Sequence, residues 1–464
     1  MNQEEKEKKK GFRLIGQGTY GCAYRPSIRC KDQKVGSAHY LSKVQVKDKS
    51  SEIELLAGTI IQTIPNHDQY FAPILDQCPI NISKIENSEL KNCDVIKEGF
   101  QSKSAPNYIS SKIRYVGKET LDDYYQHLLK PSKTPLLTLE NYWKILGNSH
   151  VYLLNSITIL NKAGLLHLDI KENNIMRDEI EKTFVIIDFG LSYEIKDLNR
   201  ENYVQHGKKP FGVQVESYIP WPIEMNIMSY IARKVQEKTS AGYGAIQPEI
   251  WSKKMENASE LKELCNIFLK TNDLLQDELF SREECKDYLE RLHKWVETMR
   301  GKTWGEVWDI VAKTHLSWDA YSLSTMYLKE MKMTNVISFL QKLPELKKAE
   351  PKLQKQARNA VTKIVTGKNP QETHHGYLMR EYVKKLKRHV LSDPETRSDA
   401  IKLGNEISTM FGKIDRFSYD VMNEEMSSSM FNHANQKKMD KKKKQNTVRE
   451  LQGDQKMRKA FNTV

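Results

Sequence analysis

Four side chains that could act together in one reaction lie in two short stretches of the sequence. The stretch "HLDIKENN" contains Asp169, Lys171 and Asn174, and the stretch "FVIIDFGLS" contains Asp188. A carboxylate can orient an attacking hydroxyl, an amine can neutralise a phosphate, and a second carboxylate with an amide oxygen can hold Mg²⁺. These residue types match what phosphoryl transfer from a magnesium nucleotide requires.

A glycine pattern near the start of the chain fits the same chemistry. Gly16, Gly18 and Gly21 give G-x-G-x-x-G in "GFRLIGQGTYGCAY", a pattern that dinucleotide-binding folds and kinases both use. The residues that follow alternate in polarity and include Pro26, which predicts a strand rather than a helix. We therefore expect a glycine hairpin whose backbone N–H groups could approach phosphates, although an ordinary β-turn would give the same pattern.

The elements expected to position these residues follow along the chain. The run "AHYLSKVQV" predicts a strand that carries Lys43. The next run, "SSEIELLAGTIIQTI", predicts a helix with Ser51 as its N-cap, and either Glu52 or Glu54 could face Lys43. Residues 108–125 predict a strand, a glycine break and the start of a polar helix.

Taken in order, "GQGTYG", Lys43, "HLDIKENN" and "DFG" resemble the motifs of eukaryotic-type protein kinases. The resemblance implies an α+β, two-lobed protein kinase-like fold with a small β-rich N-lobe and a larger, mainly helical C-lobe. It implies ATP and Mg²⁺ as cofactors and transfer of the γ-phosphate to serine or threonine hydroxyls of protein substrates. Catalytic roles would fall to Asp169, Lys171, Lys43 and Glu54, and metal binding to Asn174 and Asp188. Glu54 is preferred to Glu52 as the partner of Lys43.

The resemblance also implies the nucleotide contacts. Residues Gly16 to Gly21 would cover the phosphates, and Lys43 would contact the α- and β-phosphates. The adenine would lie between Ile15, Ala23, Leu41 and Met176, with the backbone of residues 114–116, including Tyr115, at its edge and Ile113 at the back of the pocket. For the apolar positions, plain core packing is an equally good interpretation.

Further motifs extend the resemblance toward the C-terminus. "SYIPWPIE" resembles the A-P-E segment of the family, and "WDAYSLSTMYL" resembles its buried helix that begins with an aspartate, here Asp319. Arg397 would then pair with Glu224. Lys171 and Ser217 favour serine or threonine acceptors over tyrosine.

The motifs divide the chain into six predicted parts. These are a charged N-terminal tail (1–10), the N-lobe (11–116), the C-lobe with the catalytic and activation segments (117–224), a helical insertion (225–316), the rest of the C-lobe (317–425) and a basic C-terminal tail (426–464). In the insertion, Ser281 and Glu284 form a predicted capping box. Its apolar stripes favour packing on the larger lobe, and a docking surface is the alternative.

Composition limits the compartment and the partners. The formal net charge is +13, and part of it lies in "KKMDKKKK", which predicts either a solvated tail or contact with an anionic partner such as nucleic acid or an acidic protein. Six cysteines with irregular spacing predict free thiols in a reducing compartment and argue against a zinc site. No apolar run is long enough for a membrane span, so we expect a soluble, cytoplasmic protein without a membrane partner. A narrower resemblance to kinase-like proteins of large DNA viruses would place it in the host cytoplasm or the virion.

Two other functions remain open from the sequence. Leu168 stands where most family members have arginine, which makes control by activation-segment phosphorylation doubtful, and Leu41 narrows the adenine pocket. Both departures favour a catalytically weak pseudokinase that acts as a nucleotide-binding scaffold, whereas the four intact catalytic side chains argue against it. A small-molecule or lipid kinase is the other alternative. The substrate, the regulation and the oligomeric state do not follow from the sequence.

Overall fold

The structure is a computed structural model of the full chain. It describes residues 11–412 apart from residues 19–20, 33, 83–89, 91, 102–106, 129–138, 207–210, 212–217, 240–241, 278 and 332–373. Contacts divide the chain into two compact units, Met1–Met410 and Phe411–Val464. The elements discussed below lie in the first unit, apart from the last two residues of α17 (Ala400–Gly412). The predicted tails, residues 1–10 and 426–464, and Ser217 lie outside the described residues.

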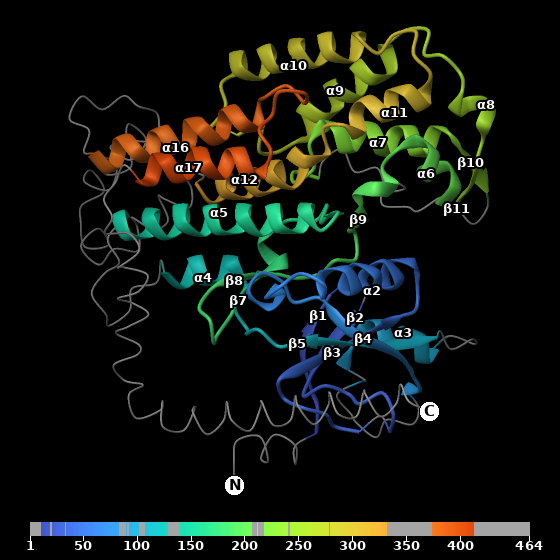
Figure 1. The fold of residues 1–464 in the computed structure, drawn as a ribbon, viewed down its shortest axis with the longest axis vertical. Helices are drawn as coiled ribbons and strands as arrows, with labels where there is room; N and C mark the ends of the chain where they lie inside the picture. Colours follow the sequence, from blue (N-terminus) through green and yellow to red (C-terminus); the bar gives the residue numbers. More distant parts are fainter. Residues whose placement is uncertain are drawn as a thin grey trace. The chain divides into compact units, whose positions relative to one another are not determined.

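A five-stranded antiparallel sheet forms the N-terminal part of the fold (Figure 1). Its order is β1-β2-β3-β5-β4, and all its strands lie within residues 11–116. The strands are β1 (Arg13–Gln17), β2 (Gly21–Arg25), β3 (Tyr40–Val46), β4 (Ile74–Ile80) and β5 (Tyr108–Arg114). The predicted strands around Lys43 and from residue 108 are confirmed as β3 and β5. Strand β4 was not predicted.

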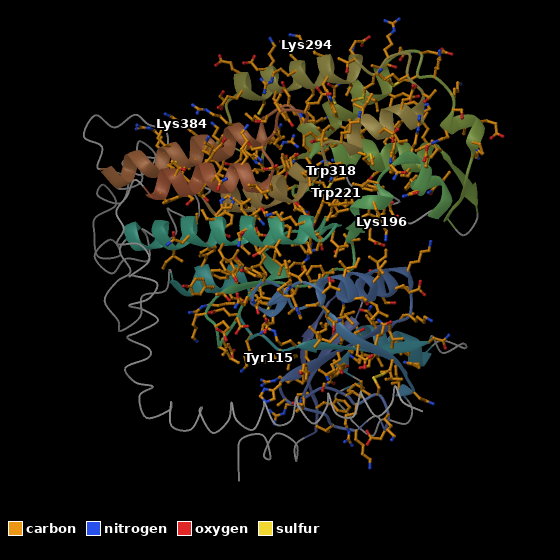
Figure 2. All side chains as sticks on the ribbon, viewed as in Figure 1. Tyr115, Lys196, Trp221, Lys294, Trp318 and Lys384 are labelled. Atoms are coloured by element: carbon orange, nitrogen blue, oxygen red, sulfur yellow. A yellow bond between two sulfur atoms is a disulfide. The ribbon has the colours of Figure 1, made fainter. Side chains whose placement is uncertain are left out.

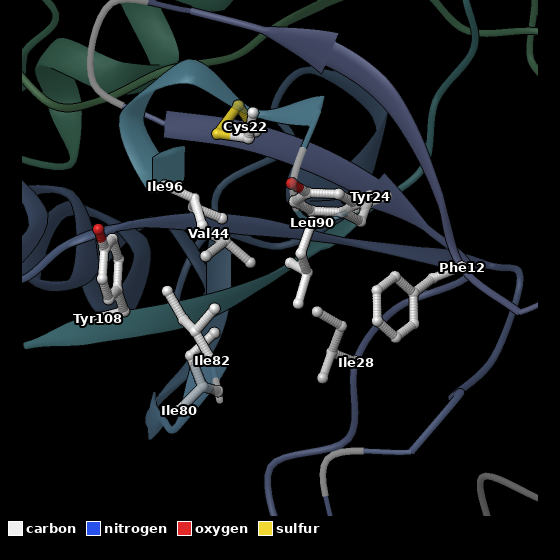
Figure 3. Close-up of a cluster of buried hydrophobic side chains, with 11 residues drawn as sticks. Phe12, Cys22, Tyr24, Ile28, Val44, Ile80, Ile82, Leu90, Ile96 and Tyr108 are labelled. Atoms are coloured by element: carbon white, nitrogen blue, oxygen red, sulfur yellow. A yellow bond between two sulfur atoms is a disulfide. The ribbon is translucent and has the colours of Figure 1, made fainter. Parts of the chain in front are cut away.

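One face of the sheet packs on an apolar cluster that includes Phe12, Tyr24, Val44 and Ile96 (Figure 3). Phe12 and Tyr24 meet edge to face with ring centroids 5.8 Å apart. Ile96 belongs to α3 (Asp94–Gln101), which therefore covers this face beside β2. Burying these side chains holds the glycine hairpin β1–β2 on the rest of the sheet, because Tyr24 and Val44 lie on neighbouring strands.

The prediction of free thiols is wrong for four of the six cysteines. Disulfides join Cys22 to Cys93, which fixes β2 to the segment before α3, and Cys30 to Cys78, which fixes the β2–β3 connection to β4. Irregular sequence spacing could not reveal these pairs, because the sheet brings the partners together from 71 and 48 residues apart. The expectation of a reducing compartment loses its basis, and sulfur atoms held in disulfides are not zinc ligands.

Helix α2 (Lys49–Ile61) packs against β4. Its N-cap is Asp48 and not the predicted Ser51, which lies at the third helical position and completes a capping box with Asp48. The Asp48 carboxylate therefore accepts the Ser51 N–H, and the Ser51 hydroxyl accepts the Asp48 N–H, at the start of the helix. Gly58 allows the close approach to the sheet, because an added Cβ would collide with the Ile74 carbonyl oxygen.

The chain after residue 116 is mainly helical, so the fold is α+β, as predicted. Its first part contains α4 (Leu121–Leu128), α5 (Leu139–Lys162), β6 (Leu165–Leu166), η4 (Glu172–Asn174), β7 (Ile175–Arg177), β8 (Phe184–Ile186), β9 (Tyr193–Glu194), η5 (Ile195–Asp197) and α6 (Arg200–His206). The short helix η1 (His67–Gln69) precedes β4 in the N-terminal part. Two short ribbons, β6–β9 and β7–β8, lie between the helices.

The predicted helical insertion contains both helices and a hairpin. Its elements are α7 (Ile223–Lys234), β10 (Gln236–Thr239), β11 (Gly242–Ile246), α8 (Pro248–Trp251), α9 (Ser259–Thr271), α10 (Arg282–Glu297), α11 (Trp304–Ala312) and η6 (His315–Ser317). The capping box of Ser281 and Glu284 is confirmed, and Thr303 begins a second one with Glu306. The β10–β11 hairpin was not predicted. Trp308 is fully buried against Tyr203, so this stripe is core.

Three helices complete the described fold: α12 (Trp318–Glu330), α16 (His374–Val390) and α17 (Ala400–Gly412). Helix α12 is buried on nearly every side and packs against α5 and α16. This position suits an element that anchors loops from several directions. None of the helices in the described ranges combines the length and the hydropathy that a membrane crossing requires.

Candidate functional site

Lys43 links two acidic side chains from separate elements. Its Nζ lies 3.0 and 2.9 Å from the two carboxylate oxygens of Glu54 on α2, and 3.3 Å from Oδ1 of Asp188. Although burial opposes its charge, these carboxylates raise the pKa of Lys43. Burial also opposes the charge of Asp188, but Lys43 lowers the pKa of that carboxyl. Lys43 and Asp188 are therefore held in their charged forms, whereas burial raises the pKa of Glu54 despite the neighbouring amine of the partly buried Lys43.

A second cluster forms in the loop after β6. The Oδ2 of Asp169 accepts hydrogen bonds from Lys171 Nζ (2.7 Å) and from Asn174 Nδ2 (2.8 Å). Asn174 Nδ2 also donates to the backbone oxygen of Asp169 at 2.9 Å. These contacts fix the three predicted side chains relative to one another within six residues of chain.

Backbone pairing brings the two clusters together. Strands β7 and β8 pair antiparallel, and the N–H of Ile187 donates to the Asn174 carbonyl oxygen at 2.9 Å. His167 accepts the Asp169 N–H at Nδ1 (3.2 Å) and so donates from Nε2 to the Ile187 oxygen (3.0 Å). Asp188 therefore follows directly after a residue that is bonded to both ends of the Asp169 loop.

Two residues of the site have strained backbones. Leu168 and Asp188 have φ angles of 62° and 61°, in the left-handed region that non-glycine residues rarely adopt. Such strain costs about 1–3 kcal/mol per residue and persists only where the surroundings impose it. At Leu168 the surroundings are Asp319 of α12, whose two carboxylate oxygens accept the N–H groups of His167 and Leu168, each at 2.8 Å.

The segment before α7 covers the same loop. Trp221, labelled in Figure 2, donates from its indole Nε1 to the Leu168 carbonyl oxygen at 2.8 Å. Ser322 of α12 donates to the Pro220 oxygen at 2.6 Å, which anchors this segment on the same helix as Asp319. The Tyr218 hydroxyl donates to Oδ1 of Asp169.

The structure also joins Glu224 to Arg397, the pair that the sequence resemblance implied. Arg397 Nη1 donates to Glu224 Oε1 at 2.5 Å, and both side chains are fully buried. Burial opposes the charge of the guanidinium, but Glu224 raises the pKa of Arg397. The pair ties the start of α7 to the segment before α17.

The three glycines of the hairpin differ in what the protein itself requires. An added Cβ on Gly21 would lie 2.5 Å from the Val44 oxygen and 2.8 Å from the Gln45 Cβ, so packing on β3 demands glycine there. On Gly16 and Gly18 the nearest atoms would lie at ordinary distances of 4.0 and 3.8 Å, and neither residue has a left-handed φ. Among the described residues, neither packing nor a left-handed φ demands glycine at these two positions, and Gly16 lies where the register of β1 on β2 shifts.

The residues predicted to surround the adenine lie on the same strands and on β7. Ala23 pairs with both Gly16 and Lys43, and Leu41 lies opposite Ile113. Ile113 and Met176 pack against an apolar cluster of Ala72, Val116 and Val185. Ile15 is 47% exposed on β1. Core packing therefore accounts for Ile113 and Met176, whereas exposed Ile15 is left to a ligand or solvent.

Tyr115 is engaged by the protein itself. Its N–H donates to the His39 oxygen at 3.0 Å, and the Arg25 guanidinium lies 3.7 Å above its ring. These contacts do not test whether Tyr115 lies at the edge of the adenine, so that stays a prediction.

The donors at Asn174 and Asp188 fit a magnesium ion. Both N–H bonds of the Asn174 amide are directed to Asp169, which leaves its oxygen for a cation, and the Asp188 side chain is 43% exposed. Mg²⁺ commonly takes one or two protein oxygens and completes its shell with phosphates and water. Within the described ranges, no three His, Cys, Asp or Glu side chains are grouped so that they could hold a metal alone.

Comparison of the sequence with protein-family models and with curated proteins gave no match. The candidate site therefore depends on the residues and their geometry. Two of its members were missed from the sequence: the indole of Trp221 and the hydroxyl of Tyr218. Both lie in "SYIPWPIE", which was recognised as a motif, but nothing in that stretch indicates that its aromatic side chains reach the loop at Asp169.

Proposed function

We propose that this protein is an ATP- and Mg²⁺-dependent protein kinase that transfers the γ-phosphate to serine or threonine hydroxyls of protein substrates. The corresponding architecture is a two-lobed kinase-like fold, with the five-stranded sheet and α2 as the small lobe and the helical region as the large one. The nucleotide would lie between them, beneath the β1–β2 hairpin.

The observation that carries the proposal is the convergence on Lys43. Glu54 and Asp188, from a helix and a loop that are 134 residues apart in sequence (188 − 54), both bond to its amine, at 2.9 and 3.3 Å. A partly buried lysine held by carboxylates is a fixed positive charge, which suits the α- and β-phosphates of a nucleotide. Stability alone gives no evident reason for this arrangement, because apolar residues would fill the same space without the cost of removing charged groups from water.

Each of the predicted site residues would have its own role in the transfer. Asn174 and Asp188 would hold Mg²⁺, which supplies positive charge to the phosphate oxygens when bound. Lys171 would neutralise the γ-phosphate. Asp169 would orient the acceptor hydroxyl and take its proton. Gly16 and Gly18 would allow the hairpin backbone to approach the phosphates.

A radiolabel transfer assay tests this function. The full chain is incubated with MgATP and a basic protein rich in serine and threonine, and incorporated phosphate is identified by phosphoamino-acid analysis. We expect Mg²⁺-dependent phosphoserine or phosphothreonine with the wild type. Asp169→Asn and Asp188→Asn should reduce incorporation by about 10²-fold or more, since each removes a charge that acts in the transition state.

Glu172→Gln is the matched control. Glu172 lies in the same loop, but its carboxylate bonds to Lys329 of α12 at 3.0 Å and not to the Asp169 cluster. Its incorporation should stay near that of the wild type. Equal incorporation by the wild type, Asp169→Asn and Asp188→Asn would refute the proposed chemistry.

A nucleotide-binding scaffold is the second candidate. Asp169 is only 7% exposed, which limits the access of an acceptor hydroxyl to its carboxylate. A scaffold would bind MgATP without turning it over. A rise in the unfolding temperature with MgATP, together with no transfer and no ATP hydrolysis, would favour this function over the kinase.

A further inference from the structure

We propose that Tyr218 is a positioning residue that holds the Asp169 carboxylate until a protein acceptor displaces its hydroxyl, and so keeps water from taking the phosphate. This inference rests on the proposed kinase function. It assigns Tyr218 the choice between two acceptors, a protein hydroxyl and water.

Donors occupy both oxygens of Asp169. Lys171 and Asn174 bond to Oδ2 at 2.7 and 2.8 Å, and the Tyr218 hydroxyl donates to Oδ1. The side chain of Asp169 is only 10% exposed. An acceptor hydroxyl that is to be oriented by Asp169 must therefore approach Oδ1, where the phenol now lies.

An anchored turn presents the phenol. The N–H of Trp221 donates to the Tyr218 oxygen at 3.0 Å, and the two rings meet edge to face with centroids 5.5 Å apart. The Trp221 indole is bonded in turn to Leu168. Because the turn is held at the Asp169 loop, the phenol can leave Oδ1 by rotating its side chain while the backbone stays in place. Burial and the neighbouring Asp169 raise the pKa of Tyr218, so its hydroxyl keeps the proton that it donates.

The nucleotide side of the site does not depend on this contact. Glu54 and Asp188 are both already bonded to Lys43 while Tyr218 covers Asp169. MgATP could thus bind in a state in which the acceptor position is closed. A closed acceptor position protects a bound nucleotide from hydrolysis.

The two competing reactions form and break the same kinds of bonds. In transfer, the acceptor oxygen bonds to the γ-phosphorus, the bond from that phosphorus to the β–γ bridging oxygen breaks with its electron pair leaving on ADP, and the acceptor proton goes to Asp169. In hydrolysis, a water oxygen takes the place of the acceptor and inorganic phosphate results. A protein acceptor makes further contacts whose binding energy can offset displacement of the phenol, whereas water has none.

The variant Tyr218→Phe tests the inference, because it removes the hydroxyl and keeps the ring. ATP hydrolysis without acceptor and phosphate transfer to the basic protein are measured on the same full-length preparation. A hydrogen bond to a charged group corresponds to about tenfold or more in a rate. We expect hydrolysis to rise by about that factor and transfer to change by less than about threefold. Tyr218→Leu, which also removes the ring, should raise hydrolysis at least as much.

Tyr230→Phe is the matched control. It also removes a hydroxyl from the same part of the chain, but that hydroxyl bonds to Glu260 at 2.6 Å. Its ratio of hydrolysis to transfer should equal that of the wild type. Unfolding temperatures of all variants show whether each is folded.

Three outcomes would overturn the inference. An unchanged ratio in Tyr218→Phe means that the hydroxyl does not select the acceptor. A parallel fall of both rates means that Tyr218 has only a structural role. Absence of both reactions in the wild type overturns the kinase proposal and this inference together, whereas transfer by the wild type with an unchanged ratio in the variant overturns this inference alone.

Discussion

Replacing Asp319 by asparagine should destabilise the protein and release the loop at Asp169. Asp319 is 1% exposed, and each of its carboxylate oxygens accepts one backbone N–H, from His167 and from Leu168, at 2.8 Å. Asparagine has nearly the same shape but presents one NH₂ group. One of the two backbone donors would then face another donor in a buried place.

The contacts set the size of the effect. A hydrogen bond to a charged group contributes about 1.5–3 kcal/mol, and a buried donor left without a partner costs about 1–3 kcal/mol. Asp319→Asn converts one such bond into such a donor and removes the charge from the other. We therefore expect the free energy of unfolding to fall by about 3–5 kcal/mol. The left-handed φ of Leu168 should relax, because the contacts that impose it are weakened.

Urea unfolding and hydrogen exchange measure the two consequences. The matched control is Asp309→Asn, since Asp309 also accepts a backbone N–H, from Arg200 at 3.1 Å, but has a side chain that is 32% exposed. It should lose less than about 1 kcal/mol. The amides of His167 and Leu168 should lose exchange protection in Asp319→Asn only. Equal stability of the two variants, or unchanged protection at His167 and Leu168, would refute the reasoning.

Three further predictions concern stability. Burial, with Asp122 and Glu172 adding to it and Lys329 opposing it, raises the pKa of Glu330 from 4.5 to about 7, so the folded state binds an extra proton between these pH values and wild-type stability should fall as pH rises from about 4.5 to 7. In urea unfolding, Glu330→Gln should therefore be more stable than the wild type by up to about 3 kcal/mol at pH 8 and equal to it at pH 4.5. Equal stability of the two proteins at both pH values would contradict this prediction. Arg397→Met leaves the Glu224 carboxylate buried without its cation and should lower the free energy of unfolding by about 3–5 kcal/mol. The double variant Arg397→Met, Glu224→Met should recover much of this loss. A double variant as unstable as Arg397→Met would show that the unpaired carboxylate is not the cause of the loss. Replacing Cys22 and Cys93 by serine opens a loop of 71 residues and should cost about 4 kcal/mol, with reductant then lowering the wild-type urea midpoint more than that of the variant.

Elements whose signal is local could be predicted from the sequence. Alternating polarity identified β3 and β5, and a serine three residues before a glutamate identified the start of α10. The candidate residues Lys43, Asp169, Lys171, Asn174 and Asp188 were chosen by type and order along the chain. The structure brings these five together in two bonded clusters that backbone pairing links.

Contacts between distant segments could not be predicted in the same way. The disulfide partners, and the anchoring of the Asp169 loop by α12, depend on which elements pack together. A pattern of residue types says which side chains can form such contacts but not which ones meet. The sequence alone determined the set of groups available for chemistry, because side-chain type is local. The tertiary structure decided that Tyr218 covers Asp169, because that contact joins residues 49 apart through a turn held in place by Trp221.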